Sequence, residues 1–302
     1  MAQISAECTS QASPLLQGIC RDGVLALRAL HGGTGLLMTG GGALPASPST
    51  VGRRLPGSPR IVVDLGATWA RFSHPGLSYT ASGTATEEQS VLAGGRATAV
   101  VGVFDGFSPV TGVSGILAVD AVAGVRWVRV PDSPVGPGST LGWGGGLRIG
   151  VFRESFSLPG ITFSATHDRA GALRYGTEEE PGAWVELEPA VTSFRAIAGK
   201  DLWPVGLSAG IGWDLYRGAG RIEARIAAEG DRQEVVATRS RNLSLDRRYL
   251  FAGLNYTWVV TQVAAEVTWT QAATPSTSLE GTGPFRPGDR QLQGAVTLRL
   301  IY

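Results

Sequence analysis

Ser164, His167 and Asp168 are the residues whose types come nearest to a catalytic set. A serine nucleophile needs a histidine within hydrogen-bond reach to accept its proton, and a carboxylate that orients the histidine. All three residues fall in segment 160–173, which the residue pattern predicts as a β-strand. Residues three apart on a strand point to opposite faces, so Ser164 and His167 are not expected to meet.

The remaining groups that could carry chemistry have simpler explanations. His31 lies at a predicted helix end, where a cation is favourable, and His74 lies beside a loop. The acidic run 178–180 is more typical of a solvated loop tip than of a metal site. Glycines 144–146 are not followed by the Lys and Ser/Thr of a phosphate-binding loop. The sequence therefore predicts no enzymatic activity, no metal and no cofactor.

Two cysteines, Cys8 and Cys20, lie near the N-terminus. They are either two unpaired thiols or one disulfide that ties down the N-terminal segment, and a disulfide requires an oxidising compartment. We favour the disulfide because of the envelope location argued below. The first residues lack the basic region and apolar run of a secretory signal, so Met1 is either native or was added to a chain whose signal was removed.

The composition narrows the class of protein. Of 302 residues, 43% are hydrophobic and 17% are charged, against about 25% charged in an ordinary soluble domain. The 26 basic and 25 acidic residues nearly cancel, which argues against nucleic acid as a partner. The longest apolar runs fall short of the roughly 18 residues of a transmembrane helix. With 43 glycines and many aromatic residues, the composition favours an all-β chain.

From residue 61 onward, apolar residues recur at every second position. One face of each segment is aliphatic, with Trp or Tyr near its ends, and the other carries glycine, serine, threonine and isolated charges. A soluble sheet would place lysines and glutamates on that second face, but the whole chain has a single lysine, Lys200. Apolar residues toward lipid, small and polar residues inside, and aromatic residues at the interfaces are typical of a transmembrane β-barrel.

Lipid requires every backbone N–H and C=O group to be paired, so such a sheet must close. A closed antiparallel barrel in one bacterial chain has an even number of strands. Connections near 105–114, 154–159, 200–203 and 261 are short, as expected of periplasmic turns, and 74–94 and 274–289 are long. We predict ten strands, with twelve as the alternative: 61–73, 95–104, 115–129, 140–153, 160–173, 184–199, 204–228, 233–260, 262–273 and 290–302.

The N-terminal part follows a different pattern. Apolar residues at three- and four-residue steps predict a helix over 13–30, and His31-Gly32-Gly33 is expected to end it. Residues 32–59 are rich in glycine, proline and serine and are predicted to be irregular. We therefore divide the chain into a helix-containing plug or periplasmic segment, 1–59, and a barrel, 60–302.

The chain resembles bacterial outer-membrane β-barrel proteins. Its last segment is similar to the C-terminal assembly signal of that family, which ends in an aromatic residue preceded by alternating apolar residues: Val296, Leu298, Leu300 and Tyr302. This resemblance implies an outer-membrane location, surrounding lipid and recognition by the barrel-assembly machinery. The helix and Gly-rich stretch of 1–59 also resemble, more distantly, the hatch of long-chain fatty-acid transporter barrels, although that family has fourteen strands and its asparagine-proline motif is absent here.

Isolated charges are predicted to point into the lumen. They either form a paired network that stabilises the barrel or line a narrow conduit. The first functional hypothesis is a narrow or plugged channel for small or hydrophobic solutes. The second is a structural or adhesive membrane module without transport, and the third is a membrane-embedded hydrolase. The candidate lumen residues are Asp64, Arg96, Asp120, Arg126, Arg148 and Asp214.

Overall fold

The computed structural model describes residues 14–53, 58–75, 87–109, 114–130, 138–177, 182–226, 235–271 and 290–301. One helix, α2 (Pro14–Thr39), precedes eleven strand segments. Their bounds are β1 (Ile61–Pro75), β2 (Glu87–Phe104), β3 (Val119–Arg129), β4 (Ser139–Phe152), β5 (Gly160–Ala170), β6 (Leu173–Gly176), β7 (Gly182–Leu202), β8 (Val205–Ile226), β9 (Val235–Trp258), β10 (Thr261–Thr270) and β11 (Leu292–Ile301).

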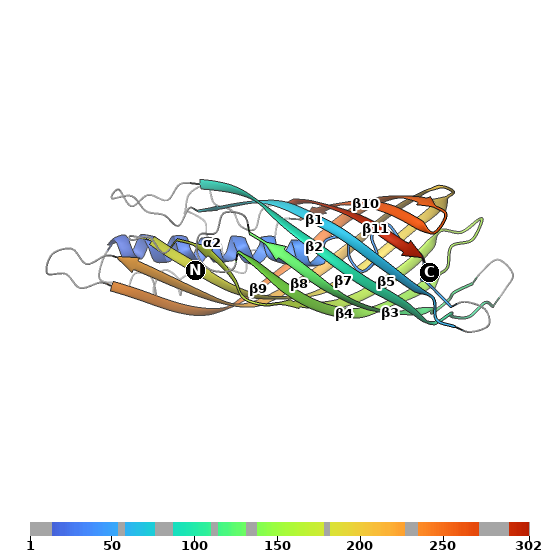
Figure 1. Cartoon of the computed structure of the whole chain (residues 1–302), viewed down its shortest axis with the longest axis horizontal. Helices are drawn as coiled ribbons and strands as arrows, with labels where there is room; N and C mark the ends of the chain where they lie inside the picture. The colour runs from blue at the N-terminus through green and yellow to red at the C-terminus, as the bar shows by residue number, and fades with distance from the viewer. Residues whose placement is uncertain are drawn as a thin grey trace.

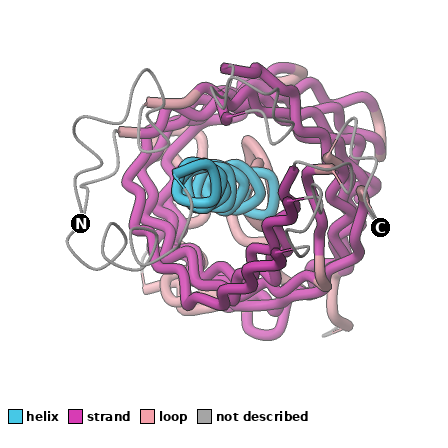
Figure 2. Tube along the Cα trace, turned by 90° about the vertical axis from the view of Figure 1, so that its left-hand side faces the viewer, coloured by secondary structure: helices cyan, strands magenta, loops and turns pink. Residues whose placement is uncertain are grey.

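The strands form one closed antiparallel barrel (Figures 1 and 2). Apart from β5 and β6, strands that follow one another in the chain pair with each other, and β1 closes the ring by pairing with β11. The short β6 continues the line of β5, because both pair with β7. Eleven segments therefore make ten wall strands, which confirms the predicted ten-strand barrel.

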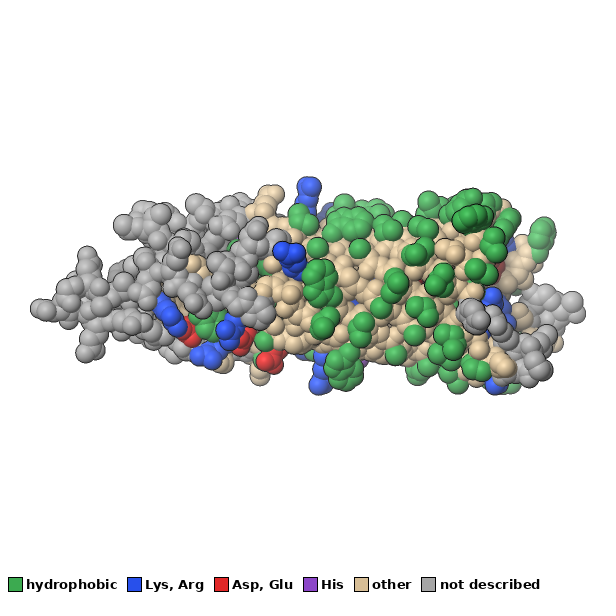
Figure 3. All heavy atoms as spheres, viewed as in Figure 1, with side chains coloured by type: hydrophobic (Ala, Val, Ile, Leu, Met, Phe, Trp, Pro, Cys, Tyr) green, Lys and Arg blue, Asp and Glu red, His purple; other side chains and the backbone are tan. Residues whose placement is uncertain are grey.

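The two faces of the wall have opposite character, as the alternation predicts. On β1, Val63 and Leu65 are 41% and 52% exposed, whereas Asp64 between them is 0% exposed. Figure 3 shows the resulting apolar side chains along the face of the barrel that is in view. Aromatic side chains are exposed on the outward face toward both of its ends: Trp69, Trp127, Trp143, Trp213 and Trp269 at one, and Trp203 and Trp258 at the other. This surface is matched to a bilayer, with amphipathic rings at the two interfaces.

The two ends of the barrel are also different. The links between β7 and β8 and between β9 and β10 are two residues each, and they lie at the end where the chain terminates. No connection at the other end between β1 and β2, β3 and β4, β8 and β9, or β10 and β11 is as short as these two links, although the β2–β3 connection at the C-terminal end also spans 105–118. β7, β8 and β9 (21, 22 and 24 residues) extend beyond the ten-residue β10 and β11 toward the other end. Because outer-membrane barrels have short periplasmic turns and longer external loops, we call this second end external.

Several strand boundaries differ from the prediction. β2 begins at Glu87 rather than 95, because residues 87–94 continue to pair with β1. β3 begins at Val119 rather than 115, since Leu117 has a left-handed backbone with φ of 59°. The predicted strand 160–173 is interrupted after Ala170. The long strands predicted over 204–228 and 233–260 are confirmed as β8 and β9.

The helix is longer than predicted. It passes through His31-Gly32-Gly33 and ends at Thr39, so the prediction of a helix end at His31 is wrong. The reason is its location inside the barrel, as Figure 2 shows from the external end. There the backbone has little water to bond with, so continued helix is the conformation that satisfies its N–H and C=O groups. Gly35 also allows close packing, since an added Cβ would lie 2.7 Å from the Tyr216 ring.

Candidate functional site: the plugged lumen

The N-terminal segment fills the lumen from the external half to the periplasmic end. We call residues 14–53 the plug. Near its start, Gly23 lies against Ile222 on the extended part of β8, and near its end Gly52 lies against Gly102 on β2. Since β2 runs toward the periplasmic turns and Gly52 lies against its end, the plug runs from the external side of the lumen to the periplasmic side. The N-terminal end of α2 therefore faces the external end (Figure 1).

The outer half of the plug packs as an ordinary hydrophobic core. Six apolar side chains of α2 are almost completely buried: Ile19, Leu25, Leu27, Leu30, Leu36 and Met38. Leu27 and Leu30 belong to one buried cluster with wall residues that include Val185, Leu187 and Leu243. The wall at this level is therefore apolar on the inside, unlike the polar lining expected of an aqueous pore.

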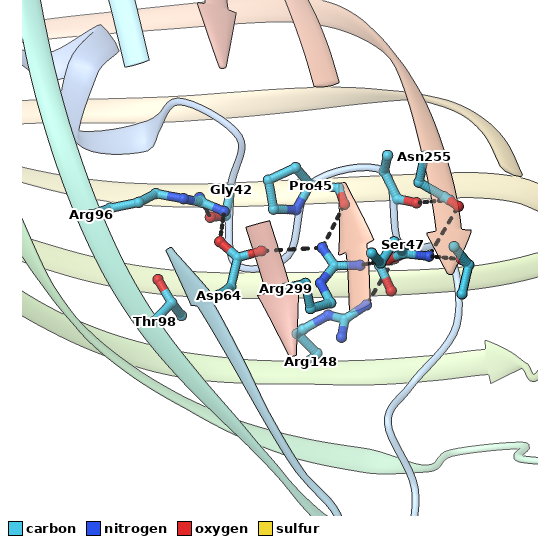
Figure 4. A network of polar contacts seen from close by, with 12 residues as sticks. Gly42, Pro45, Ser47, Asp64, Arg96, Thr98, Arg148, Asn255 and Arg299 are labelled. Carbon is cyan, nitrogen blue, oxygen red and sulfur yellow. Dashed lines mark hydrogen bonds and ion pairs between the residues drawn. The ribbon is translucent and has the colours of Figure 1, made fainter. Parts of the chain in front are cut away.

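The inner half is built around a buried ion cluster, shown in Figure 4. The Asp64 carboxylate accepts from Arg96 Nη2 at 2.7 Å and from Arg299 Nη2 at 3.3 Å. All three side chains are at most 3% exposed. One carboxylate thus compensates two guanidinium groups, and the remaining N–H groups of both arginines need other acceptors.

Several of those acceptors are backbone carbonyls of the plug, while Arg299 Nη1 donates to Gln262 Oε1 on the wall. Arg96 Nη1 donates to the carbonyls of Gly40 and Gly42, and Arg299 Nη2 donates to that of Pro45 at 2.7 Å. Two more side chains continue the row: Arg148 Nη2 donates to the carbonyls of Ser47 and Ser49, and Asn255 Nδ2 to that of Ala46 (Figure 4). The irregular chain that follows α2 is therefore held by its main chain, where buried carbonyls require donors.

The plug ends on two carboxylates. Asp120 accepts from the backbone N–H of Val51 at 2.9 Å and pairs with Arg148 at 3.3 Å. Asp105 accepts from the backbone N–H of Arg53 at 2.6 Å. The plug therefore presents carbonyls to arginines and amides to aspartates along its length from Gly40 to Arg53.

A periplasmic turn also contacts the plug. The backbone N–H of Glu154 donates to Ser49 Oγ at 3.1 Å, and its carboxylate accepts from the backbone N–H of Asp201 at 2.7 Å. Partial burial raises the pKa of the Glu154 carboxyl above its ordinary value. This turn is therefore a second point at which the wall fixes the plug exit.

The six predicted lumen residues are all buried, but they do not form one cluster. Asp64, Arg96, Asp120 and Arg148 surround the plug. Arg126 pairs instead with Asp168 at 3.2 Å, and Asp214 accepts from Tyr216 Oη at 3.1 Å. Whether any of them lines a solute path stays a prediction. Further buried charges of the wall include Arg195, Glu266 and Arg299. Their inward parity on the predicted strands was the signal that could have identified them.

The histidines occupy separate places. His167 is exposed on the outer face, where Nδ1 lies 2.9 Å from Thr192 Oγ1, while Ser164 lies opposite the inward-facing Arg148 in the β4–β5 register. His74 is buried near the external end, 2.9 Å from Ser90 Oγ and 3.1 Å from Tyr175 Oη. Contrary to expectation, His31 lies within α2, where its ring contacts Tyr216 edge-on.

Two sequence predictions fall partly outside the described residues. The disulfide stays a prediction, because Cys8 is not among them, although Cys20 is buried on α2. In the assembly signal, Val296, Leu298 and Leu300 are 41–51% exposed on the outward face, and Tyr302 is not described.

Within the described part of the chain, no group of three or more His, Cys, Asp or Glu residues could hold a metal ion. None of the described helices is long and apolar enough to span a membrane.

These features define the class of the protein: a closed antiparallel β-barrel of the bacterial outer membrane, with a plugged lumen. No family model and no curated protein matches the sequence. Similar solved structures include the outer membrane protease OmpT from Escherichia coli (TM-score 0.41, 8% identity, 80% of this chain and 97% of that chain). The translocator domain of the autotransporter NalP from Neisseria meningitidis has a TM-score of 0.35 at 10% identity, covering 82% of this chain and 90% of that one. These likenesses are too low to carry an argument about function. The hatch resemblance of 1–59 stays a prediction.

Proposed function

We propose that the protein is a filled, non-conducting barrel that anchors its N-terminal chain and its long strands at the external face of the outer membrane. This is the module without transport among the three hypotheses. The observation that carries the proposal is the docking of the plug, which runs through the lumen with the N-terminal end of α2 toward the external end. We further propose that the protein is not an enzyme, in line with the separate places of Ser164 and His167.

The energies favour a permanent plug over one that leaves the lumen. Each of the six buried side chains of α2 contributes about 1.5–3 kcal/mol, which amounts to about 9–18 kcal/mol. A ligand present at a thousand times its Kd supplies about 4 kcal/mol. Binding of a solute is therefore too weak to expel the helix, before the arginine–carbonyl hydrogen bonds are considered.

Surface labelling tests the external presentation. An epitope tag placed after Ala2 should be bound by antibody on intact cells, because the N-terminal end of α2 faces outward. The matched control carries the same tag after Phe156, which is fully exposed in the turn between β4 and β5 and should be reached only after the outer membrane is broken. An N-terminal tag that becomes accessible only together with the control would refute the orientation.

Conductance tests the filled lumen. The intact chain in a planar bilayer should show no steady ionic current. A reproducible current from the intact protein would contradict the proposal and favour a channel.

A second candidate is a plugged channel for small hydrophobic solutes, favoured by the apolar lining of the outer half of the lumen. It requires the segment that follows α2 to rearrange while the helix stays in place. Uptake of a labelled apolar compound into vesicles that contain the intact protein, above the uptake of protein-free vesicles, would support it. Equal uptake would reject it.

A further inference from the structure

Exposed arginines follow the external ring of tryptophans around the barrel. Arg71 and Arg129 lie two residues beyond Trp69 and Trp127 on β1 and β3, toward the external end. Across the strand pairs, Arg169 lies opposite Trp143, and Arg248 lies opposite Trp213. Arg290 precedes Leu292, the register partner of Trp269. We call Arg71, Arg129, Arg169, Arg248 and Arg290 the arginine arc; all five are exposed.

The arc occupies the level at which a bilayer changes from hydrocarbon to headgroups. Tryptophans of a transmembrane barrel lie at that interface. Two residues along a strand span roughly 7 Å, so Arg71 and Arg129 reach past the rings into the headgroup layer. Figure 3 shows basic side chains where the apolar band ends on its external side.

Three members of the arginine arc lack a compensating acidic side chain. Among the described residues, Arg71, Arg129 and Arg248 form no ion pair. Asp246, an outward acid at this level, pairs with Arg217 at 2.9 Å on the neighbouring part of the wall. At the periplasmic rim, Arg153 pairs with Asp105 at 3.1 Å, and Lys200 donates to the carbonyls of Ser155 and Phe156. Three exposed arginines beside the external tryptophans are therefore without an acidic partner among the described residues.

From this geometry we infer that the arginine arc binds the phosphate groups of phosphorylated lipids in the external leaflet. A guanidinium group offers planar, paired N–H donors that match phosphate oxygens. The arginine arc lies at the level of the external tryptophans and just beyond it. Its position fits lipid headgroups that surround the barrel, because each arginine is on the outward face rather than in a shared cleft. The inference is independent of what happens in the lumen.

The test measures lipid preference of the folded barrel. The intact chain is reconstituted in vesicles of phosphatidylcholine with diphosphoryl lipid A, and the lipids retained on the purified barrel are counted by native mass spectrometry. The test variant is R71Q/R129Q/R248Q. The matched control is R217Q/D246N, which removes one arginine of the same external face together with its own partner.

We expect the triple variant to lose at least about tenfold in its preference for lipid A over phosphatidylcholine. The control should stay within about twofold of the parent, and raised salt should weaken retention by the parent. A heat-modifiable gel shift confirms that each variant is folded. An unchanged preference in the folded triple variant would overturn the inference, as would an equal loss in the control.

Discussion

Replacing Asp64 by Asn should strongly destabilise the barrel while keeping the shape of the side chain. Asp64 is 0% exposed and is the common partner of Arg96 and Arg299. Asn keeps one acceptor oxygen, but it replaces the other with an NH2 donor and removes the negative charge. Two buried guanidinium groups then face each other without compensation, on the part of the wall that holds the plug carbonyls of Gly40, Gly42 and Pro45.

The expected loss follows from this burial. Breaking a buried ion pair by removing one partner costs about 3–5 kcal/mol, and here one substitution breaks two pairs, so the upper part of the range applies. The control is D246N, because Asp246 and Arg217 are each 51% exposed. Exposed pairs contribute about 0–1 kcal/mol. The two substitutions are chemically identical and differ in burial.

The assay is equilibrium unfolding by urea of the barrel in lipid vesicles, followed by tryptophan fluorescence. D64N should lower the free energy of unfolding by at least about 3 kcal/mol relative to D246N. If the two variants lie within about 1 kcal/mol of each other, the Asp64 cluster does not stabilise the fold, and the account of the inner half of the plug is refuted.

Three further predictions follow from the same structure. L27A should cost about 2–5 kcal/mol in the same unfolding assay because Leu27 is fully buried, whereas L65A on the lipid face should cost clearly less, and equal losses would contradict the core described for α2. G102A should speed hydrogen exchange at the Val51 and Gly52 amides, because the added Cβ would lie 1.7 Å from the Gly52 carbonyl oxygen. The control G95A, where the nearest atom to an added Cβ is 3.6 Å away, should leave this exchange unchanged. Equal exchange rates in the two variants would refute the close approach of the plug to β2. The Glu154 pKa is raised in the folded state, so its contribution to stability is present at low pH and is lost as the pH rises through that pKa; E154Q should flatten this part of the pH profile by less than about 1 kcal/mol, and an unchanged profile would count against the raised pKa.

Much of the wall could be predicted because alternate residues of each strand face lipid and lumen, and lipid favours apolar side chains whereas the lumen favours small and polar ones. The period-two pattern around Asp64 and Arg299 is enough to identify the inward face from the amino-acid sequence. Even parity and the long segments over 204–260 identify ten strands, which the structure confirms. The start of β2 was not predictable in the same way, because residues 87–94 (EEQSVLAG) begin with a polar run without period-two alternation, and their pairing with β1 depends on the partner strand.

The plug was harder to predict for a different reason. Gly32 and Gly33 normally end a helix in water, where the freed backbone groups are solvated. Inside a barrel that alternative is absent, so the helix continues to Thr39. The contacts of residues 40–53 are also poorly visible in sequence, because the acceptors are backbone carbonyls, which every residue has.

The same contacts give the glycines of the plug a specific role. Gly42 has φ of +57°, and a Cβ there would lie 2.2 Å from Arg195 Nη1. Its carbonyl meanwhile accepts from Arg96, so one residue must approach two guanidinium groups from different sides. Only a residue without a side chain can do so at this backbone conformation. The high glycine content therefore has two separate causes: small inward residues on the wall that make room for the plug, and glycines in the plug that let its main chain reach the arginines of the wall.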